Sequence, residues 1–185
     1  LELKVAFAGL TNFFCFALSR ADDALAEVIA MNLGSNNIAV DVESVAPIQP
    51  IGMGGQGGVW LAEADILGGG GFLQCAVKQV KKAWVTRDGR KVVAVRPITE
   101  RKCLTECGHH PFITTCFAAF QTHDSLFMCL ELAPGGDLYT LSNSTGCDGL
   151  PEGHARFYFT CIALALRHLH CHGWVYRDIK LENVL

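Results

Sequence analysis

The last ten residues of the chain, Tyr176-Arg177-Asp178-Ile179-Lys180-Leu181-Glu182-Asn183-Val184-Leu185, decide the fold. They place a lysine two residues after an aspartate and an asparagine five residues after it. This spacing suits phosphoryl transfer, in which a carboxylate faces a substrate hydroxyl while an amide oxygen reaches a metal ion. The plainer alternative is a polar loop that follows a helix, and Asp-x-Lys alone would favour it. The arginine and the asparagine in register favour the chemical interpretation.

The loop resembles the catalytic loop of eukaryotic protein kinases, His-Arg-Asp-x-x-x-x-Asn, with Tyr176 in the place of the histidine. The resemblance implies that Asp178 orients a Ser or Thr hydroxyl and accepts its proton. It also implies that Lys180 neutralises charge on the transferring group and that Asn183 binds Mg²⁺. Upstream we therefore expect, in this order, a glycine loop that covers the phosphates of ATP, a lysine and a partner glutamate.

A glycine-rich run occupies residues 51–62, with Gly-x-Gly-x-x-Gly at Gly52, Gly54 and Gly57, followed by Val59. Glycine is needed where backbone amides approach phosphate oxygens without a side chain in the way. Dinucleotide-binding folds use the same letters, but they open a helix at the third glycine. Here β-forming residues follow and lead into a glycine turn at 68–71. The sequence therefore predicts a hairpin like the kinase phosphate lid, and a dinucleotide-dependent enzyme is the weaker alternative.

A third strand is expected over 72–78, ending in Cys-Ala-Val-Lys. It resembles the Val-Ala-Ile-Lys of kinases, which implies that Ala76 and Lys78 belong to the ATP site and that the lysine reaches the phosphates. The alternative is a surface lysine at a strand end. Residues 98–107 have helical character, and Glu-Arg-Lys-Cys-Leu from Glu100 is similar to a run in the cyclic-nucleotide-dependent kinases. Glu100 is the expected partner of Lys78, with Glu106 as the fallback.

Two further strands are expected over 112–120 and 125–132. The second resembles the strand and hinge that hold adenine, which implies that Leu130 stands at the back of the pocket. It also implies that the backbone of Glu131 and Ala133 bonds the base edge, and that Asp137 meets ribose or substrate.

A helix follows, with Pro151 in its first turn and Gly173 just past its end. Apolar residues recur along it at helical spacing, so we expect a buried scaffold helix. Its predicted core residues are Phe157, Tyr158, Cys161, Ile162, Ala165, Leu166 and Leu169.

Composition indicates a globular chain, because half of its 185 residues are hydrophobic and 18% are charged. The formal net charge of -3 gives no overall basic field for nucleic acid or a membrane surface. Nine of the fifteen Lys and Arg residues fall within 78–102, which is most simply a solvated face. The densest apolar stretch, 157–166, is too short to span a bilayer.

Nine cysteines lie along the chain without regular spacing, so we expect reduced thiols in an intracellular protein. Two groups of residues raise zinc binding as a minor alternative. The ordinary interpretation is a kinase segment leading into a strand for the first group and a helix end for the second, where histidine suits the negative pole. The first comprises Cys103, Cys107, His109 and His110, and the second comprises His168, His170, Cys171 and His172.

The expected fold is α+β and protein-kinase-like, with an antiparallel β small lobe and the beginning of a helical large lobe. Residues 46–185 would form this partial kinase domain and residues 1–45 a flanking segment. In that segment we expect a strand near Phe13 and a helix after Ser19. The run Cys15–Asp22 resembles the closing strand and helix of a cyclic-nucleotide-binding domain. Tyr176 before Arg177-Asp178, together with the run Pro151–Tyr158 and Lys81-Lys82, looks most like the group containing the cyclic-nucleotide-dependent (AGC-type) kinases. Its cyclic-GMP branch is the leading identification, partly because of the N-terminal run.

Two departures from the family pattern matter. Leu181 stands where proline is usual, at a position without chemical duty. No Asp-Phe-Gly follows Asn183 within the chain, which begins at Leu1. We expect a longer protein that phosphorylates Ser or Thr of protein substrates with ATP and Mg²⁺, and an inactive 185-residue piece. Its partners would include a cyclic nucleotide bound upstream, but no nucleic acid. The rival hypothesis is an ATP-binding pseudokinase or scaffold.

Overall fold

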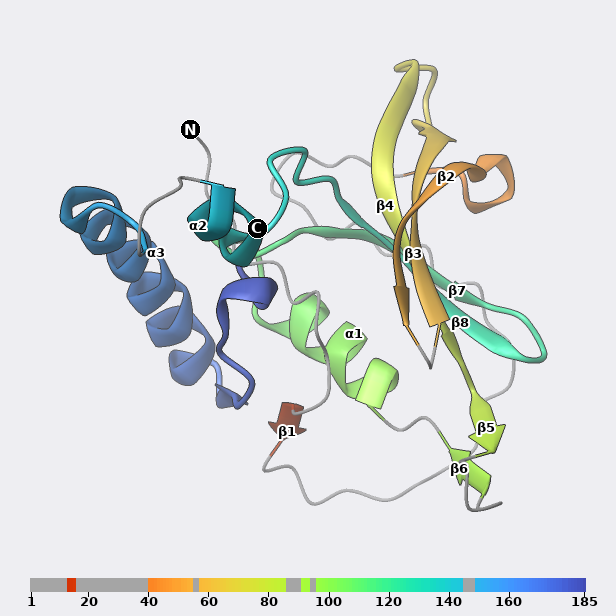
Figure 1. Ribbon diagram of the computed structural model, residues 1–185. Coiled ribbons are helices and arrows are strands. Elements are labelled where there is room, and N and C mark those ends of the chain that lie inside the picture. The colour runs from red at the N-terminus through yellow and green to blue at the C-terminus, as the bar shows by residue number, and fades with distance from the viewer. Residues whose placement is uncertain (1–12, 16–39, 55–56, 86–90, 94–95, 145–148) are drawn as a thin grey trace. The chain divides into compact units, whose positions relative to one another are not determined.

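The computed structural model describes residues 13–15, 40–54, 57–85, 91–93, 96–144 and 149–185 (Figure 1). They form two compact units, which we describe separately. Within the described ranges, unit 2 comprises the residues between 40 and 108 together with 115–132. Unit 1 comprises 13–15, 109–114 and the residues from 133 onward. The expected helix after Ser19 lies outside the described residues.

The centre of unit 2 is a five-stranded antiparallel sheet in the order β2-β3-β4-β8-β7 (Figure 1). Three of the pairs, β2–β3, β3–β4 and β7–β8, join strands that follow one another in the chain. The fourth pair, β4–β8, joins strands that are far apart in the sequence. The expected glycine hairpin is present as β2 and β3. The strands are β2 (Ala46–Gly54), β3 (Gly57–Asp65), β4 (Phe72–Lys81), β7 (Cys116–Gln121) and β8 (Ser125–Glu131).

Smaller elements complete unit 2. A 3-10 turn, η1 (Val42–Ser44), precedes β2, and its N-cap residue Asp41 accepts the Glu43 amide on Oδ1 at 3.0 Å. The hairpin of β5 (Ala83–Val85) and β6 (Lys91–Val93) leads to the helix α1 (Arg96–Glu106), which packs against β7.

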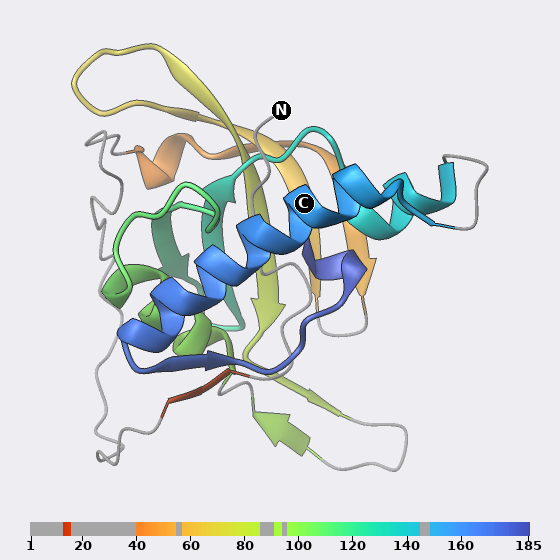
Figure 2. The same ribbon diagram turned by 90° about the vertical axis from the view of Figure 1, so that its left-hand side faces the viewer.

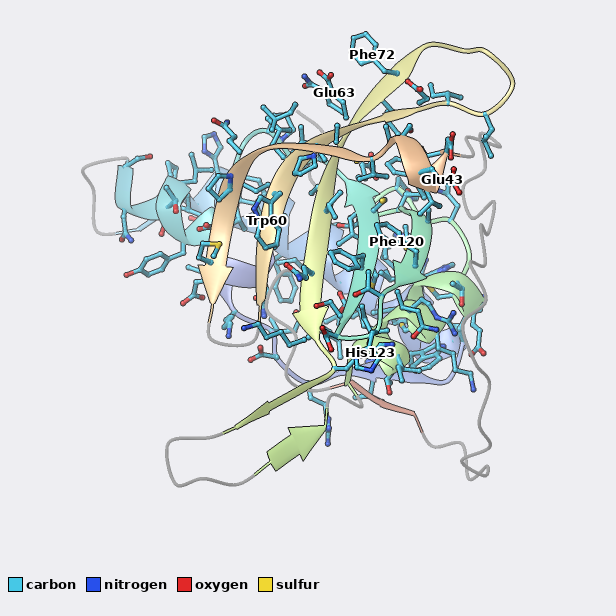
Figure 3. All side chains as sticks on the ribbon, turned by 90° about the vertical axis from the view of Figure 1, so that its right-hand side faces the viewer. Glu43, Trp60, Glu63, Phe72, Phe120 and His123 are labelled. Atoms are coloured by element: carbon cyan, nitrogen blue, oxygen red, sulfur yellow. The ribbon has the colours of Figure 1, made fainter. Side chains whose placement is uncertain are left out.

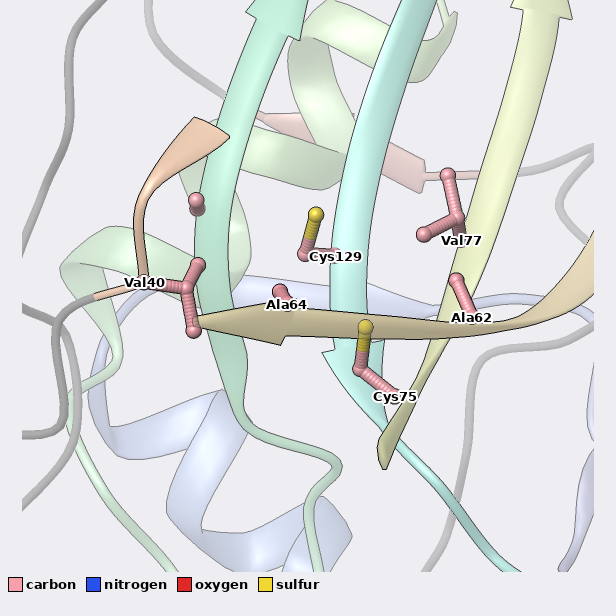
Figure 4. Close-up of a cluster of buried hydrophobic side chains, with 7 residues drawn as sticks. Val40, Ala62, Ala64, Cys75, Val77 and Cys129 are labelled. Atoms are coloured by element: carbon pink, nitrogen blue, oxygen red, sulfur yellow. The ribbon is translucent and has the colours of Figure 1, made fainter. Parts of the chain in front are cut away.

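One face of the sheet carries a compact apolar core (Figure 4). Its side chains come from alternate positions of β3, β4, β7 and β8 together with Val40, as expected where successive strand residues point to opposite faces. Trp60 and Phe120 lie over the sheet in Figure 3, whereas Phe72 extends from the first position of β4 and is 66% exposed. The buried members are Val40, Ala62, Ala64, Cys75, Val77, Ala118 and Cys129.

Unit 1 contains the long helix α3 (Glu152–Cys171), the short helix α2 (Leu138–Ser144) and the 3-10 turn η2 (Leu181–Asn183). Figure 2 shows α3 along its length and the strand that returns beside it. That strand, β9 (Trp174–Tyr176), pairs antiparallel with β1 (Phe13–Cys15). Gly173 ends α3 with a φ of 78°, a conformation that other residues rarely adopt.

The buried stripe of α3 is narrower than the sequence predicts. Tyr158, Cys161, Ala165 and Leu169 are buried at intervals of three and four, as on one face of a helix. Ile162 and Leu166 are only half-buried, and the expectation that Phe157 is buried is wrong because it is 47% exposed.

Pro151 precedes the first turn of α3 instead of lying in it. Its ψ is 142°, and its carbonyl accepts the Ala155 amide at 2.9 Å.

The expectation of a strand over 112–120 is also wrong at its start, because β7 begins at Cys116. The preceding residues form a turn, in which the Ile113 amide donates to the His110 carbonyl at 3.0 Å. This turn lies ahead of β7, so residues 112–115 are not part of that strand. Among the described helices, none is both long and apolar enough to cross a membrane.

Candidate functional site

The predicted phosphate-binding lysine is buried in unit 2 and paired with a carboxylate. The Lys78 ammonium lies 3.1 and 3.0 Å from the two carboxylate oxygens of Glu100. Lys78 is 8% exposed and Glu100 1% exposed. Burial raises the pKa of the Glu100 carboxyl, and the charge of Lys78 opposes that rise. The fallback, Glu106, instead lies 3.7 Å from Lys102 on the exposed side of α1.

The residues predicted to surround ATP share one face of the sheet. Gly52 lies opposite Val59, and Val59 lies opposite Lys78 in the next strand. Ala76 lies opposite Leu130 in the same way. Residues directly opposite each other, and those two positions along, point to one side of a sheet. The side chains of Val59, Ala76, Lys78 and Leu130 therefore lie on the face opposite the apolar core.

Strand packing alone constrains one glycine of the hairpin, whatever the hairpin binds. Gly54 and Gly57 face each other at the ends of β2 and β3. A Cβ atom added to Gly57 would lie 2.0 Å from the Gln79 carbonyl oxygen, which no real contact allows. Gly52 is less constrained, because its nearest neighbour would be Val59 Cβ at 3.8 Å. Close strand packing by itself thus requires glycine at position 57.

The predicted hinge begins at the end of β8. The Glu131 amide donates to the Thr115 carbonyl at 2.8 Å, and the Thr115 amide donates to Glu131 Oε2 at 3.2 Å. The sequence did not predict these two hydrogen bonds between Thr115 and Glu131, because no motif points to Thr115. In unit 1, the Ala133 carbonyl accepts the Gly136 amide at 3.4 Å.

Asp137 already has a structural duty in unit 1. Its Oδ1 accepts the Thr140 amide at 2.7 Å, which satisfies a donor in the first turn of α2. A carboxylate has a second oxygen, so a contact with ribose or substrate is compatible with this cap.

The carboxylate of the terminal loop is held by two of its own neighbours. Asn183 Nδ2 donates to the Asp178 carbonyl at 2.7 Å and to Asp178 Oδ2 at 3.1 Å. Lys180 Nζ lies 3.1 Å from the same Oδ2. Asn183 is 1% exposed, whereas Lys180 is exposed. The three predicted residues are therefore in contact within unit 1.

A backbone bond that the sequence did not indicate ties this loop to α2. The Leu138 amide, at the start of α2, donates to the Val184 carbonyl at 2.8 Å. Both side chains are buried. Since Asn183 precedes Val184, the bond fixes the end of the loop that carries the amide. The sequence could not predict this hydrogen bond, because Leu138 and Val184 are ordinary apolar residues that belong to no motif.

The minor zinc alternative has no arranged site here. Throughout the described ranges, no three His, Cys, Asp or Glu side chains are grouped so that they could hold a metal ion. The cysteines described there carry free thiols, and all but Cys171 are buried.

Comparison with known proteins decides the family, because residues 46–185 match the protein kinase domain. The chain belongs to the protein kinase domain family. It is similar to human protein kinase C eta type, with 38% identity over 152 residues and 82% of this chain covered. It is also similar to phototropin-1A of rice, at 31% over 80% of the chain, and to serine/threonine-protein kinase nrc-2 of Neurospora crassa, at 34% over 80%.

The chain spans 20%, 15% and 23% of the length of these three kinases. The α+β fold expected from the sequence is confirmed. The five-stranded antiparallel sheet of unit 2 is consistent with the small lobe of a kinase, and the helices of unit 1 with the start of the large lobe. The division at residue 46 and the roles of single residues stay predictions.

Proposed function

We propose that this kinase domain serves a protein that transfers the γ-phosphoryl group of ATP to Ser or Thr hydroxyls of protein substrates. The observation that carries the proposal is the buried pair of Lys78 with both oxygens of Glu100. Burying two charges costs several kcal/mol per ion, roughly what their attraction returns, so stability alone gives little reason to keep them. A lysine held in this way presents a fixed positive charge on the same sheet face as Val59, Ala76 and Leu130.

In this proposal the apolar side chains of that face contact the adenine ring, and Lys78 binds its phosphates. The glycine hairpin covers the phosphates through backbone amides that no side chain blocks. The backbone of Glu131 and Ala133 recognises the base edge, and Asp137 contacts ribose or substrate with the oxygen that does not cap α2.

Asp178 would orient the substrate hydroxyl and accept its proton as the oxygen attacks phosphorus and the bond to the ADP oxygen breaks. The contacts of Asp178 with Asn183 and Lys180 set its direction before substrate arrives. Lys180 is exposed and can move from Asp178 to the transferring group. The Asn183 amide oxygen is the kind of ligand that would hold Mg²⁺, and the ion, when bound, would neutralise charge on the phosphates.

The rival, an ATP-binding pseudokinase, predicts nucleotide binding without transfer. The test uses the full-length protein with labelled ATP, Mg²⁺ and a Ser/Thr peptide mixture. Wild-type protein should label the peptides, and Asp178→Asn should bind nucleotide equally but transfer at least ~10²-fold more slowly. Asp124→Asn, a matched change in the exposed β7–β8 turn, should act like wild type. Nucleotide binding without transfer by wild-type protein, both with and without added cyclic GMP or cyclic AMP, would establish the pseudokinase.

We further infer membership of the cyclic-nucleotide-dependent group, an inference that goes beyond the family. It rests on the resemblance of Cys15–Asp22 to the end of a cyclic-nucleotide-binding domain and on Tyr176 before Arg177. In the same assay, cyclic GMP added to full-length protein should raise transfer more than cyclic AMP does. Equal rates with and without either nucleotide would contradict this inference.

A further inference from the structure

Three imidazole rings are stacked where the segment His109–Thr114 meets the end of α3. The ring centroids of His110 and His168 are 4.7 Å apart, with a tilt of 35° between the rings. Those of His168 and His172 are 4.4 Å apart, with a tilt of 41°. All three residues belong to unit 1. The kinase chemistry described above uses none of them, so the stack calls for its own explanation.

The hydrogen bonds of His110 determine which of its ring nitrogens carries the proton. Its Nδ1 accepts the Phe112 amide at 3.2 Å, so a neutral His110 must carry its proton on Nε2. The His110 carbonyl accepts the Ile113 amide in the same turn. A second proton on His110 can only go to Nδ1, where it would face the Phe112 NH. Protonation therefore removes a bond that closes the turn.

The surroundings of His110 also disfavour its positive charge. Burial lowers its pKa, and His168, His109 and Arg167 lower it further because each is positive when charged. His172 belongs to the same stack, and its Nδ1 donates to the His168 carbonyl at 2.8 Å. No acidic group is among those that shift the pKa of His110. A positive charge on His110 is therefore opposed by His168 and Arg167 on α3 and by His109 on its own segment.

A bound metal ion is a less suitable explanation for the stack. His110 offers no nitrogen lone pair to a metal, because Nδ1 accepts an amide and Nε2 carries the proton. The described part of the chain also contains no group of three ligating side chains arranged for a metal ion. The proton is therefore the ligand that the stack fits.

We propose that His110, stacked with the rings of His168 and His172, forms a proton-sensitive clasp that holds the segment His109–Thr114 against the end of α3 while His110 is neutral and opens when His110 takes up a proton. An unfolded or opened His110 binds a proton more readily than the closed one, so the closed state loses stability as pH falls below about 6.5. The segment follows α1 after two residues, and α1 carries Glu100. Opening thus releases the chain just beyond the helix that holds Lys78.

The experiment measures amide hydrogen exchange of the peptide spanning 109–116 in the full-length protein by mass spectrometry. Exchange times are scaled for the intrinsic pH dependence of amide exchange. Between about pH 7.5 and about pH 5.5, wild-type protection should fall by up to ~10-fold per pH unit through the titration. Exchange of the imidazole C2 hydrogen in the same samples should give His110 a midpoint below about 6.5.

Two variants separate the clasp from general acid sensitivity. His110→Asn keeps an oxygen that can accept the Phe112 amide but cannot take the proton, so protection should no longer depend on pH. His168→Phe keeps an aromatic ring that cannot carry a positive charge, so the His110 midpoint should rise, while the lowering of its pKa by burial remains. His154→Asn, on an exposed turn of α3, is the matched control and should behave as wild type. Constant wild-type protection, or a pH step that persists in His110→Asn, would overturn the proposal.

Discussion

The buried pair of Lys78 and Glu100 makes a sharp prediction about stability and its pH dependence. Replacing Lys78 with methionine keeps the length of the side chain but leaves Glu100, which is 1% exposed, without its counter-ion. The carboxyl must then either stay charged in a buried site or take up a proton. Both outcomes are measurable, and they differ with pH.

The magnitude follows from the distances. At 3.0 Å and an effective dielectric constant near 20, the attraction of the two charges is about 5.5 kcal/mol. Removing each ion from water costs several kcal/mol, so the intact pair contributes little net stability. Removing Lys78 loses this attraction, but the cost of keeping the Glu100 charge out of water remains. We therefore expect Lys78→Met to lower the free energy of unfolding by about 3–5 kcal/mol at about pH 8.

The loss should shrink as pH falls. Burial already raises the pKa of Glu100, and without Lys78 it must rise further. In the variant the folded state then keeps a proton that the unfolded state releases, so stability decreases with rising pH. The slope can reach about 1.4 kcal/mol per pH unit above the ordinary pKa of glutamate. Adding Glu100→Gln to Lys78→Met removes the titrating group and should abolish this slope.

The assay is denaturant unfolding of the kinase domain followed by tryptophan fluorescence, at several values from about pH 5.5 to about pH 8. The double variant should be more stable than Lys78→Met at the upper end and close to it at the lower end. The reasoning fails if the stability of Lys78→Met depends on pH no more than that of wild type. It also fails if the double variant loses as much free energy of unfolding as the two single variants added together, because Glu100 is then not confined in a buried site.

Two further changes test the hairpin and the start of α2. Gly57→Ala should lower the free energy of unfolding by about 1–3 kcal/mol, because its Cβ would meet the Gln79 carbonyl. The control Gly135→Ala, whose Cβ would meet nothing within 4 Å, should change it little. Equal melting temperatures of the two variants would refute the close packing at Gly57. Asp137→Ala should cost about 1 kcal/mol through the lost bond to the Thr140 amide, and Asp137→Asn should keep that stability while raising KM for nucleotide or peptide. An unchanged KM in Asp137→Asn would confine this residue to capping.

The sequence alone predicted those features that local chemistry specifies. The glycines and β-formers between 51 and 71 specify hairpins, because each strand pairs with its chain neighbour through a short turn. Gly173 stops α3 for an equally local reason. The spacing of Asp178, Lys180 and Asn183 likewise suffices to bring them together within one short loop.

Tertiary structure alone decided contacts between segments far apart in the chain. The sequence offered both Glu100 and Glu106 to Lys78, and only the packing of α1 on the sheet selected the first, because residues six apart on a helix point in different directions. It also overturned the strand over 112–115, where propensity favoured extension but His110 and its neighbours close a turn. Register across β2, β3 and β4, which aligns Gly52, Val59 and Lys78, is likewise a property of the assembled sheet.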